Sequence, residues 1–281
     1  MQTETITSAQ NPKFRNLLLL QEKARERRAQ GLFVVEGLRE LRHCIEAGFT
    51  VKTVFVCPEI AGRWPVGAGH DAYTGHDGPV IPGLTGNLIE IPEALYRKAA
   101  YREGTEGVIA EVVYKERRLE DLKLRENPLV VVLESVEKPG NLGAVLRSAD
   151  ATGADAVLVA DPLTDLYNPN LIRASLGGIF TCQVAAAATE KLIPWLKQKG
   201  FRILTAQLQD SKWYYDTDMT APTALVMGTE STGLTQPWRE AADAHIRIPM
   251  LGRLDSLNVS VSAAILLYEA VRQRKMGEVH F

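Results

Sequence analysis

The sequence predicts an α/β protein of two domains, with a mostly parallel sheet in the C-terminal one. The chain has 281 residues, of which 46% are hydrophobic, and this length exceeds that of a usual single domain. From residue 128 onward, apolar runs such as LVVVLESV alternate with helical stretches, as parallel strands buried on both faces do. Before that point the elements are shorter, and Gly and Pro are frequent over 58–86. We predict one domain over 1–110, a linker over 111–127 and a second domain over 128–281.

Composition and charge exclude several classes of protein. A net charge of −2 gives no overall cationic field, so a nucleic acid would have to be attracted by local patches. No stretch approaches the roughly 20 apolar residues of a membrane span, and MQTETITSAQNPK lacks the basic and apolar regions of a secretory signal. Cys44, Cys57 and Cys182 are odd in number and scattered, which predicts reduced thiols and a cytoplasmic protein.

Short strands and helices alternate in the first domain. LFVVEG and VKTVFVC are rich in β-branched and aromatic residues, and GLRELRHCIEAG between them is an amphipathic helix that ends at Gly48. GVIAEVVYKE has the pattern of a last strand. The Gly/Pro-rich stretch carries the metal-capable residues His70, Asp71, His76 and Asp77, but no helical or strand periodicity would fix them as ligands. We predict a surface insertion there and no metal site.

A basic patch lies near the N-terminus. The segment KFRNLLLLQEKARERR, residues 13–28, holds six basic residues and two acidic ones, a net charge of +4 on one predicted helix. A solvated helix face with ion pairs between turns is one interpretation, and binding of phosphate groups is the other. The candidates for phosphate binding are Lys13, Arg15, Arg25, Arg27 and Arg28.

Helices and strands alternate regularly in the second domain. The strand LVVVLESV precedes a helix around GAVLRSADATG, and the strand AVLVAD precedes the helix NPNLIRASLGGIF. A shorter strand near TCQVAA, the helix EKLIPWLKQKG, two strands in RILTAQL and TALVMG, the helix LTQPWREAAD and the strand HIRIP follow. Small polar residues then alternate with apolar ones, as in a half-buried strand, before a final helix that is apolar on nearly every side from Ala263 to Val271. This order predicts helices on both faces of the sheet.

Three loops at the carboxyl ends of predicted strands carry unusual residues, and ligands of open α/β sheets gather at these ends. In EKPGNLGAVLRSAD, Gly140 and Gly143 permit close backbone approach, and Asn141 lies six residues before Arg147. An ordinary strand-to-helix turn with a surface arginine explains the same pattern, because a lone Gly-x-x-Gly is weak.

The other two loops follow TALVMG and HIRIP. In LVMGTESTGLTQ, Gly228 ends the strand, Glu230 lies in the turn, and Gly233 allows a positive φ before the next helix. A carboxylate in such a turn can simply cap a helix. In IPMLGRLDSLN, Ser256 and Asn258 precede the last helix; an N-cap role explains Asn258 alone but not the set.

These three loops resemble the three motifs of the SpoU/TrmH-type RNA 2′-O-ribose methyltransferases of the SPOUT superfamily. NLGAVLR is similar to the first motif, LVMGTESTGL to the second and IPMLGRLDSLNVSVSAAILLYEA to the third, in that order, over about residues 128–275. The first half, with NPKFRNLLLLQEKARERRAQGLFVVEG, resembles the L30e-like substrate-binding domain of members that act on ribosomal RNA. The Gly/Pro-rich stretch over 58–86 departs from that pattern.

The resemblance implies a trefoil-knotted catalytic domain, S-adenosylmethionine as cofactor, RNA as partner and a homodimer. By position it implies cofactor binding by Gly228, Ile248, Met250 and Leu257, and a reacting centre of Asn141, Arg147, Glu230, Ser256 and Asn258. It also explains why polar residues lead into an apolar helix. Cofactor and ribose would partner polar groups that otherwise cost about 1–3 kcal/mol each when buried unpaired.

The implied reaction transfers a methyl group from a sulfonium to a ribose 2′-oxygen. The protein has to supply mainly alignment, which is worth on the order of 7–11 kcal/mol in favourable cases. Because the Arg147 guanidinium stays protonated, we interpret it as an electrostatic stabiliser of the forming alkoxide and leave the proton acceptor open. Asn141 would orient Arg147 or the ribose, and Glu230 would fix Arg147 or Asn141. Ser256 and Asn258 would hold the region of the nucleophile.

Large-subunit ribosomal RNA is the predicted substrate, because tRNA-specific members of this type tend to carry short flanking helices in place of an N-terminal domain. A tRNA methyltransferase is the alternative within the enzyme class, and an antibiotic-resistance methyltransferase of the same build stays open. The rival from another class is a non-catalytic RNA-binding scaffold. The intact set Asn141, Arg147, Glu230 and Asn258 argues against the scaffold, since a pure binder does not need it.

Overall fold

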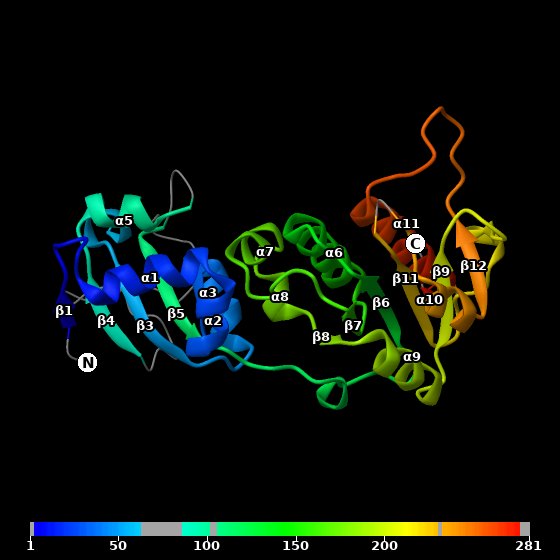
Figure 1. Cartoon of the computed structure of the whole chain (residues 1–281), viewed down its shortest axis with the longest axis horizontal. Helices are drawn as coiled ribbons and strands as arrows, with labels where there is room; N and C mark the ends of the chain where they lie inside the picture. Colours follow the sequence, from blue (N-terminus) through cyan, green and yellow to red (C-terminus); the bar gives the residue numbers. More distant parts are fainter. Residues whose placement is uncertain (1–2, 63–85, 102–105, 230–231, 276–281) are drawn as a thin grey trace. The chain divides into compact units, whose positions relative to one another are not determined.

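The structure, a computed structural model, describes residues 3–62, 86–101, 106–229 and 232–275. By their contacts the residues form two units, each with its own sheet (Figure 1). The first unit is Met1–Glu116 together with Tyr167–Thr181, and the second is Arg117–Leu166 together with Cys182–Phe281. The predicted second domain over 128–281 thus contains a segment whose contacts group it with the first unit.

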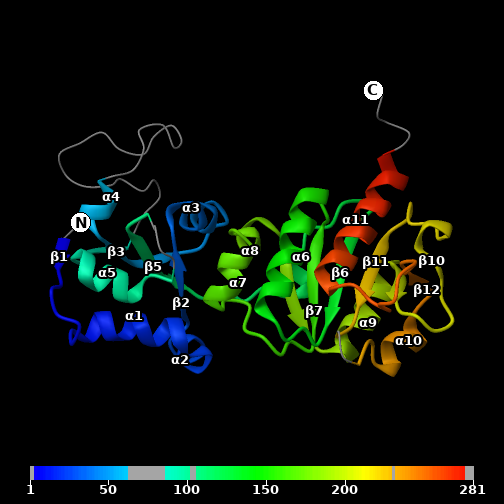
Figure 2. The same cartoon turned by 90° about the horizontal axis from the view of Figure 1, so that it is seen from above.

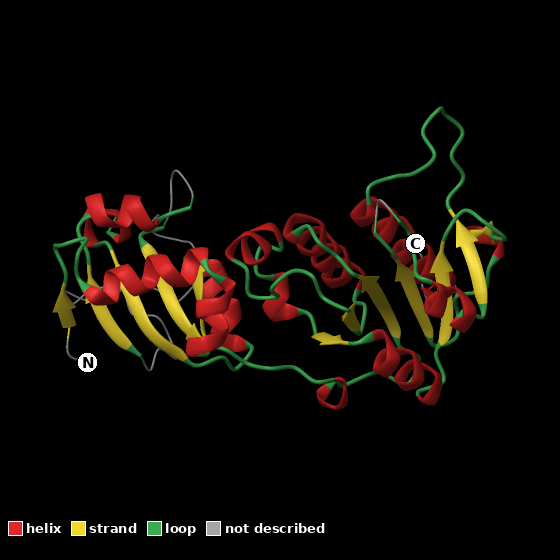
Figure 3. Cartoon of the chain, viewed as in Figure 1, coloured by secondary structure: helices red, strands yellow, loops and turns green. Residues whose placement is uncertain are grey.

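The first unit holds a mixed five-stranded sheet in the order β1-β4-β3-β5-β2. β1, β4 and β3 run parallel, and β5 lies antiparallel to both β3 and β2. The strands, drawn in yellow in Figure 3, are β1 (Thr3–Thr5), β2 (Leu32–Glu36), β3 (Val51–Val56), β4 (Asn87–Glu90) and β5 (Val108–Val113). The predicted strands LFVVEG, VKTVFVC and GVIAEVVYKE are all present, and β5 runs past the expected domain boundary at residue 110.

Both faces of this sheet are covered by apolar side chains. Alternation in β2 sends Leu32 and Val34 into a core with α1, whereas Phe33 stacks on Tyr167 with ring centroids 4.2 Å apart. Tyr167 begins the segment that joins this unit from the second half of the sequence. The helices of the unit are α1 (Pro12–Glu22), α2 (Ala24–Gln30), α3 (Leu38–Glu46), α4 (Pro58–Ala61), α5 (Glu93–Ala99), α7 (Pro169–Ala174) and α8 (Gly178–Thr181).

The second unit holds a seven-stranded sheet in the order β10-β12-β9-β11-β6-β7-β8, and every pair of neighbours is parallel. This confirms the predicted parallel sheet, while the trefoil knot stays a prediction. All six residues of β6 are buried, as expected for a strand covered on both faces. The strands are β6 (Leu129–Glu134), β7 (Ala156–Ala160), β8 (Val184–Ala187), β9 (Arg202–Ala206), β10 (Lys212–Trp213), β11 (Thr223–Met227) and β12 (Ala244–Arg247).

Helices cover both faces of the parallel sheet. α6 (Pro139–Thr152) and α11 (Val259–Lys275) pack together on one face, with α6 against β7 and α11 against β11 and β6. α9 (Thr189–Gln198) and α10 (Gln236–Ala241) lie on the other face, where Trp195 and Trp238 are buried in the core (Figure 2). Two short 3₁₀ turns, η1 (Leu119–Asp121) and η2 (Tyr214–Asp216), complete the unit. None of the helices in the described parts of the chain has the length and apolar character needed to cross a membrane.

Two local predictions differ from the structure. Residues 256–262, whose alternation was interpreted as that of a half-buried strand, are irregular up to Asn258 and helical from Val259. Within the described part of the chain no strand pairs with these residues, so their alternating side chains have no sheet to face. The final helix is also less enclosed than expected, because Val261 is 47% and Tyr268 53% exposed.

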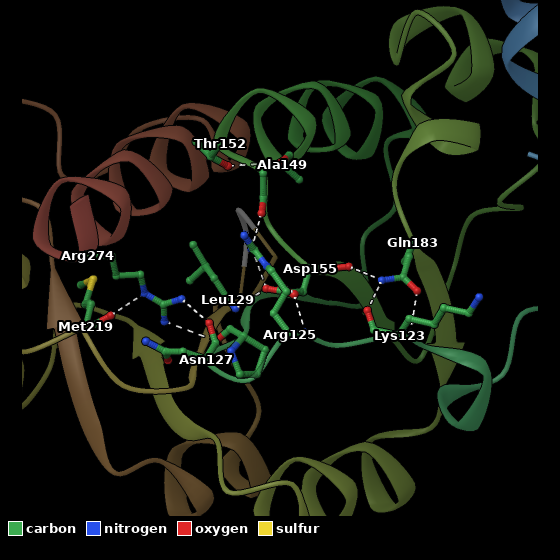
Figure 4. A network of polar contacts seen from close by, with 12 residues as sticks. Lys123, Arg125, Asn127, Leu129, Ala149, Thr152, Asp155, Gln183, Met219 and Arg274 are labelled. Carbon is green, nitrogen blue, oxygen red and sulfur yellow. Dashed lines mark hydrogen bonds and ion pairs between the residues drawn. The ribbon is translucent and has the colours of Figure 1, made fainter. Parts of the chain in front are cut away.

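The amino ends of the parallel strands are held by a buried carboxylate, drawn in Figure 4. Asp155, with its side chain 2% exposed, accepts hydrogen bonds from Nε and Nη2 of Arg125 at 2.9 Å each and from the backbone N–H of Leu129 at 2.7 Å. Arg274 near the end of α11 donates to the carbonyls of Met219 and Asn127 at 2.9 and 3.0 Å. These contacts fasten the connector and α11 to one end of the sheet and leave the carboxyl end for a ligand.

Candidate active site

The carboxyl ends of β9, β11 and β12 point to one edge of the sheet, as the arrowheads in Figure 3 show, and a cleft lies there. Its cavity volume is ≈ 360 Å³, which lies within the range of small-molecule sites. Five residues predicted from the motifs line this cleft: Gly228, Ile248, Met250, Ser256 and Leu257. The structure therefore brings the predicted cofactor-binding residues of the second and third motifs together.

A second hollow adjoins the cleft at the end of β6. Asn141 of the first motif and Glu134, the last residue of β6, line it. Gly228, Thr229 and Val259 line both hollows, so the two share a wall. All three predicted loops thus meet at one edge of the sheet.

The turn after β11 is so tight that only glycine fits at its start. A Cβ on Gly228 would lie 2.2 Å from the carbonyl carbon and oxygen of Gly233, which real contacts never show. Gly233 has φ 69°, as predicted, and exchanges backbone hydrogen bonds of 3.3 and 3.1 Å with Thr229. The buried carboxylate of Glu134 anchors the end of the turn by accepting from the backbone N–H of Thr235 at 2.9 Å. The described ends of the turn, Gly228–Thr229 and Gly233–Thr235, are therefore held close together by backbone contacts and by Glu134.

Asn258 connects the third motif to the first. Its Nδ2 donates a hydrogen bond to Oδ1 of Asn141 at 3.1 Å, and its own Oδ1 accepts from the backbone N–H of Ser260 at 2.9 Å. The second bond is that of an N-cap, so the predicted capping role of Asn258 is confirmed. The bond to Asn141 is a further interaction that the cap does not require.

Two residues of the predicted reacting centre, Arg147 and Glu230, are not placed in either hollow by the described part of the structure. Arg147 lies on α6 with an exposed side chain and is not among the described residues that line either hollow. Glu230 falls outside the described residues, as do His70, Asp71 and the rest of the near-repeat. Of the predicted reacting centre, the structure brings Asn141 and Asn258 into contact and places Ser256 in the adjoining cleft.

Two family models match the chain. The model of the SpoU rRNA Methylase family matches residues 128–268, which is half of the chain and contains the first two motifs and all but the last two residues of the third. The chain belongs to the SpoU rRNA methylase family. The model of the MRM3-like substrate binding domain matches residues 11–110, within the region predicted as the first domain.

Relatives within the SpoU family are similar over most of the chain. The 23S rRNA (uridine(2479)-2′-O)-methyltransferase of Streptomyces viridochromogenes is 28% identical over 277 residues, 96% of this chain and 93% of that protein. The 23S rRNA (guanosine-2′-O-)-methyltransferase RlmB of Pseudomonas putida is 35% identical over 199 residues, 68% of this chain and 80% of that protein. The crystal structure of the AdoMet-bound rRNA methyltransferase from Sinorhizobium meliloti has a TM-score of 0.82 at 26% identity, covering 100% of both chains.

Two polar residues that line the cleft at the carboxyl ends of β9, β11 and β12 were not predicted as site residues from the sequence. Gln207 directly follows β9 and Arg247 ends β12, and both line the cleft. The signal that points to them is their place at carboxyl ends of parallel strands. The predicted site residues of the three motifs lie in or next to glycine-containing loops, whereas these two residues lie beside no glycine.

The basic segment forms α1 and α2, and four of its five candidate residues are exposed: Lys13, Arg15, Arg25 and Arg28. Lys13 forms an ion pair with Glu4. Arg27 corrects the prediction, because it is 2% exposed and donates from Nη1 to the carbonyls of Leu20 and Gln21 at 2.7 and 3.0 Å. These are carbonyls in the last turn of α1, so Arg27 satisfies a helix end and is not a surface cation.

Proposed function

We propose that the protein transfers a methyl group from S-adenosylmethionine to a ribose 2′-hydroxyl of 23S ribosomal RNA. The observation that carries this proposal is the meeting of three motif loops at one edge of the sheet, with Asn141 bonded to Asn258 beside the cleft. Membership of the SpoU family and the similarity to two 23S rRNA 2′-O-methyltransferases support it.

The cleft fits the proposed cofactor. Apolar side chains of Ile248, Met250 and Leu257 offer a surface for a nucleoside, and the tight turn at Gly228 brings backbone groups to the same wall. The Nε atom of Arg247 is buried in this cleft and has no hydrogen-bond partner among the described residues, which suits a polar ligand. When bound, S-adenosylmethionine supplies an activated methyl group.

The residues of this chain then orient the ribose and stabilise charge. Asn141 and Asn258 hold each other, so either amide can fix a sugar hydroxyl at a defined position. Arg147 carries a permanent positive charge, and we assign it to the alkoxide that forms as the 2′-hydroxyl is deprotonated. Glu230 and Ser256 complete the proposed centre, with Glu230 assigned to orient Arg147 or Asn141.

The first unit supports ribosomal RNA over tRNA as the substrate. The MRM3-like substrate binding domain model matches it, and the S. viridochromogenes enzyme is similar over both halves of this chain. Arg15, Arg25 and Arg28 expose three positive charges within one short region of this unit, as phosphate binding requires. We assign the RNA backbone contacts to these residues.

We further propose a cytoplasmic homodimer in which α11 contributes to the interface. Val261 and Tyr268 are seven residues apart on α11, hence on one face, and both are about half exposed. An apolar stripe on an otherwise packed helix is typical of a subunit interface. Light scattering of the purified protein would give the mass of two chains, and Tyr268→Glu would reduce it to one.

The function is tested with methyl-labelled S-adenosylmethionine and purified 23S rRNA, 16S rRNA and tRNA. We expect label on 23S rRNA alone, in the ribose of one nucleotide, with mapping in a strain that lacks the protein identifying the same site. Label on tRNA alone would favour the tRNA enzyme. RNA binding without cofactor binding in calorimetry would identify a scaffold.

A further inference from the structure

Gln207 and Arg247 lie side by side at the carboxyl end of the parallel sheet. Ala206 of β9 pairs in register with Ile246 of β12, and the backbone N–H of Gln207 donates to the carbonyl of Ile246 at 3.0 Å. Residues in register on parallel neighbours project to the same face. Both side chains therefore enter the cleft from one face of the sheet, next to each other.

The guanidinium of Arg247 is held by an aromatic platform. Trp213 of β10 pairs in register with Arg247, and its ring centroid lies 4.2 Å from the guanidinium carbon. Trp213 in turn stacks on Tyr215, with centroids 6.3 Å apart. A cation on the face of a tryptophan is stabilised and confined to one orientation. The Nε–H of Arg247 is nevertheless buried, with no acceptor among the described residues.

Gln207 offers the complementary group. Its Nε2 donates to the carbonyl of Gln209 at 3.0 Å, which fixes the amide. Its Oε1 is buried and has no donor within the described part of the chain. A buried donor on Arg247 and a buried acceptor on Gln207 in one cleft are costly unless a ligand pairs with both.

The chemistry of the two groups selects the ligand group. A cationic donor matches a carboxylate, and a neutral amide oxygen matches an ammonium group. The α-amino-acid end of S-adenosylmethionine carries this pair of charges on one carbon, whereas its ribose hydroxyls are neutral and would leave the charge of Arg247 unmatched. We propose that Arg247 binds the carboxylate and Gln207 the ammonium of the cofactor's amino-acid end. This inference rests on the proposed cofactor.

Calorimetry with two product-like ligands tests it. S-adenosylhomocysteine carries the amino-acid end, and 5′-methylthioadenosine lacks it. Arg247→Met keeps a long unbranched side chain and removes the charge, so it should weaken the binding of S-adenosylhomocysteine about ten- to a hundredfold and leave that of 5′-methylthioadenosine within about twofold. Gln207→Leu should show the same selectivity with a smaller loss of affinity, because the hydrogen bond that it removes joins the ligand's ammonium to a neutral amide.

The matched control is Arg202→Met, which removes an arginine from the other end of β9, where Nη1 donates to the carbonyl of Asp218 at 2.8 Å. It should change neither affinity. Should Arg247→Met fail to fold, Gln207→Leu and Arg247→Lys carry the test. Because lysine keeps a positive charge, the loss of S-adenosylhomocysteine affinity in Arg247→Lys should be no greater than twice the loss in Gln207→Leu.

Three results overturn the inference. Equal weakening of both ligands by Arg247→Met would show that Arg247 does not address the amino-acid end. Unchanged affinity for S-adenosylhomocysteine in both variants would show that neither residue contacts it. If the wild-type protein binds neither ligand, the proposed cofactor fails and the inference falls with it, and this outcome is distinct from the first two.

Discussion

Nδ2 of Asn258 donates to Oδ1 of Asn141 across 3.1 Å, although the two residues are 117 positions apart in the sequence. The bond ties the start of α11 to the first turn of α6. Since the same Asn258 side chain accepts from the backbone N–H of Ser260 at 2.9 Å, one amide both caps a helix and fixes its neighbour. Structure and proposed chemistry depend on opposite ends of this amide, so they can be separated by substitution.

Asn258→Asp should separate the two roles. The carboxylate can still accept from Ser260 and suits the positive end of α11, so the melting temperature should stay within about 2 °C. It cannot donate to Asn141, and turnover should fall at least tenfold. Asn258→Ala, which loses both roles, should also lose about 1 kcal/mol of stability. Thermal unfolding and methyl transfer are measured in parallel; wild-type turnover in Asn258→Asp would contradict the role of the bond.

Gly228→Ala should disrupt the cofactor cleft. The added Cβ would meet the Gly233 carbonyl at 2.2 Å, so the turn must move, and we expect a loss of about 1–3 kcal/mol in stability with cofactor affinity reduced at least tenfold. The matched control is Gly140→Ala on α6, where a Cβ would have nothing within 4 Å. Because alanine favours the helix, this control should be neutral or stabilised by up to about 1 kcal/mol. Equal cofactor affinity in Gly228→Ala and Gly140→Ala would show that the turn is not part of the binding site.

Arg147→Ala should abolish methyl transfer and leave the fold intact. The side chain is exposed, so stability should change by no more than about 0.5 kcal/mol. Cofactor affinity, measured by calorimetry, should stay within a few-fold. Arg147→Lys keeps the charge without the planar fork and should retain part of the activity. Near wild-type turnover in Arg147→Ala would withdraw its assignment.

Reversal of Arg15, Arg25 and Arg28 to Glu should weaken RNA binding. The plot of log affinity against log salt should become shallower, because fewer counterions are released from the RNA. Arg27 is left unchanged in this variant, since its buried guanidinium holds the end of α1 and Arg27→Glu should unfold the unit. RNA affinity equal to that of wild type at every salt concentration would show that the basic residues of α1 and α2 are only solvated and do not bind RNA.

Asp155 should make stability depend on pH in the acid range. Burial raises the pKa of its carboxyl, but hydrogen bonds from the side chain and backbone of Arg125 and from the backbone of Leu129 outweigh it, and the net pKa is lowered. A lowered folded-state pKa gives stability that is present above the unfolded value of about 3.9 and is lost as pH falls through the folded value.

Asp155→Asn removes that contribution. Its free energy of unfolding should lie below that of wild type by about 1.5–3 kcal/mol near pH 7, and the difference should shrink below about pH 4. Denaturant unfolding from pH 3 to pH 8 measures it. Asp218→Asn, at a carboxylate whose side chain is 59% exposed, is the control and should change stability far less. A pH-independent difference would assign the effect of Asp155→Asn to packing.

Much of the fold was predictable because its signals are local. The apolar run in β6, the positive φ of Gly233 and the N-cap at Asn258 each depend on a few neighbouring residues, and each was confirmed. The motif residues Gly228 and Leu257 were also found in one cleft as expected, since carboxyl ends of parallel strands meet at one edge.

The sequence by itself determined the long strands and helices of the parallel sheet, the positive φ of Gly233 and which loops carry the polar residues. Only the tertiary structure decided that Arg247 stands on Trp213 beside Gln207, that Arg27 is buried under α1, and that Tyr167 stacks on Phe33 of the first unit. The physical reason is that periodicity and turn chemistry report the backbone within a few residues, whereas strand register and the face that a side chain meets are fixed by partners distant in sequence.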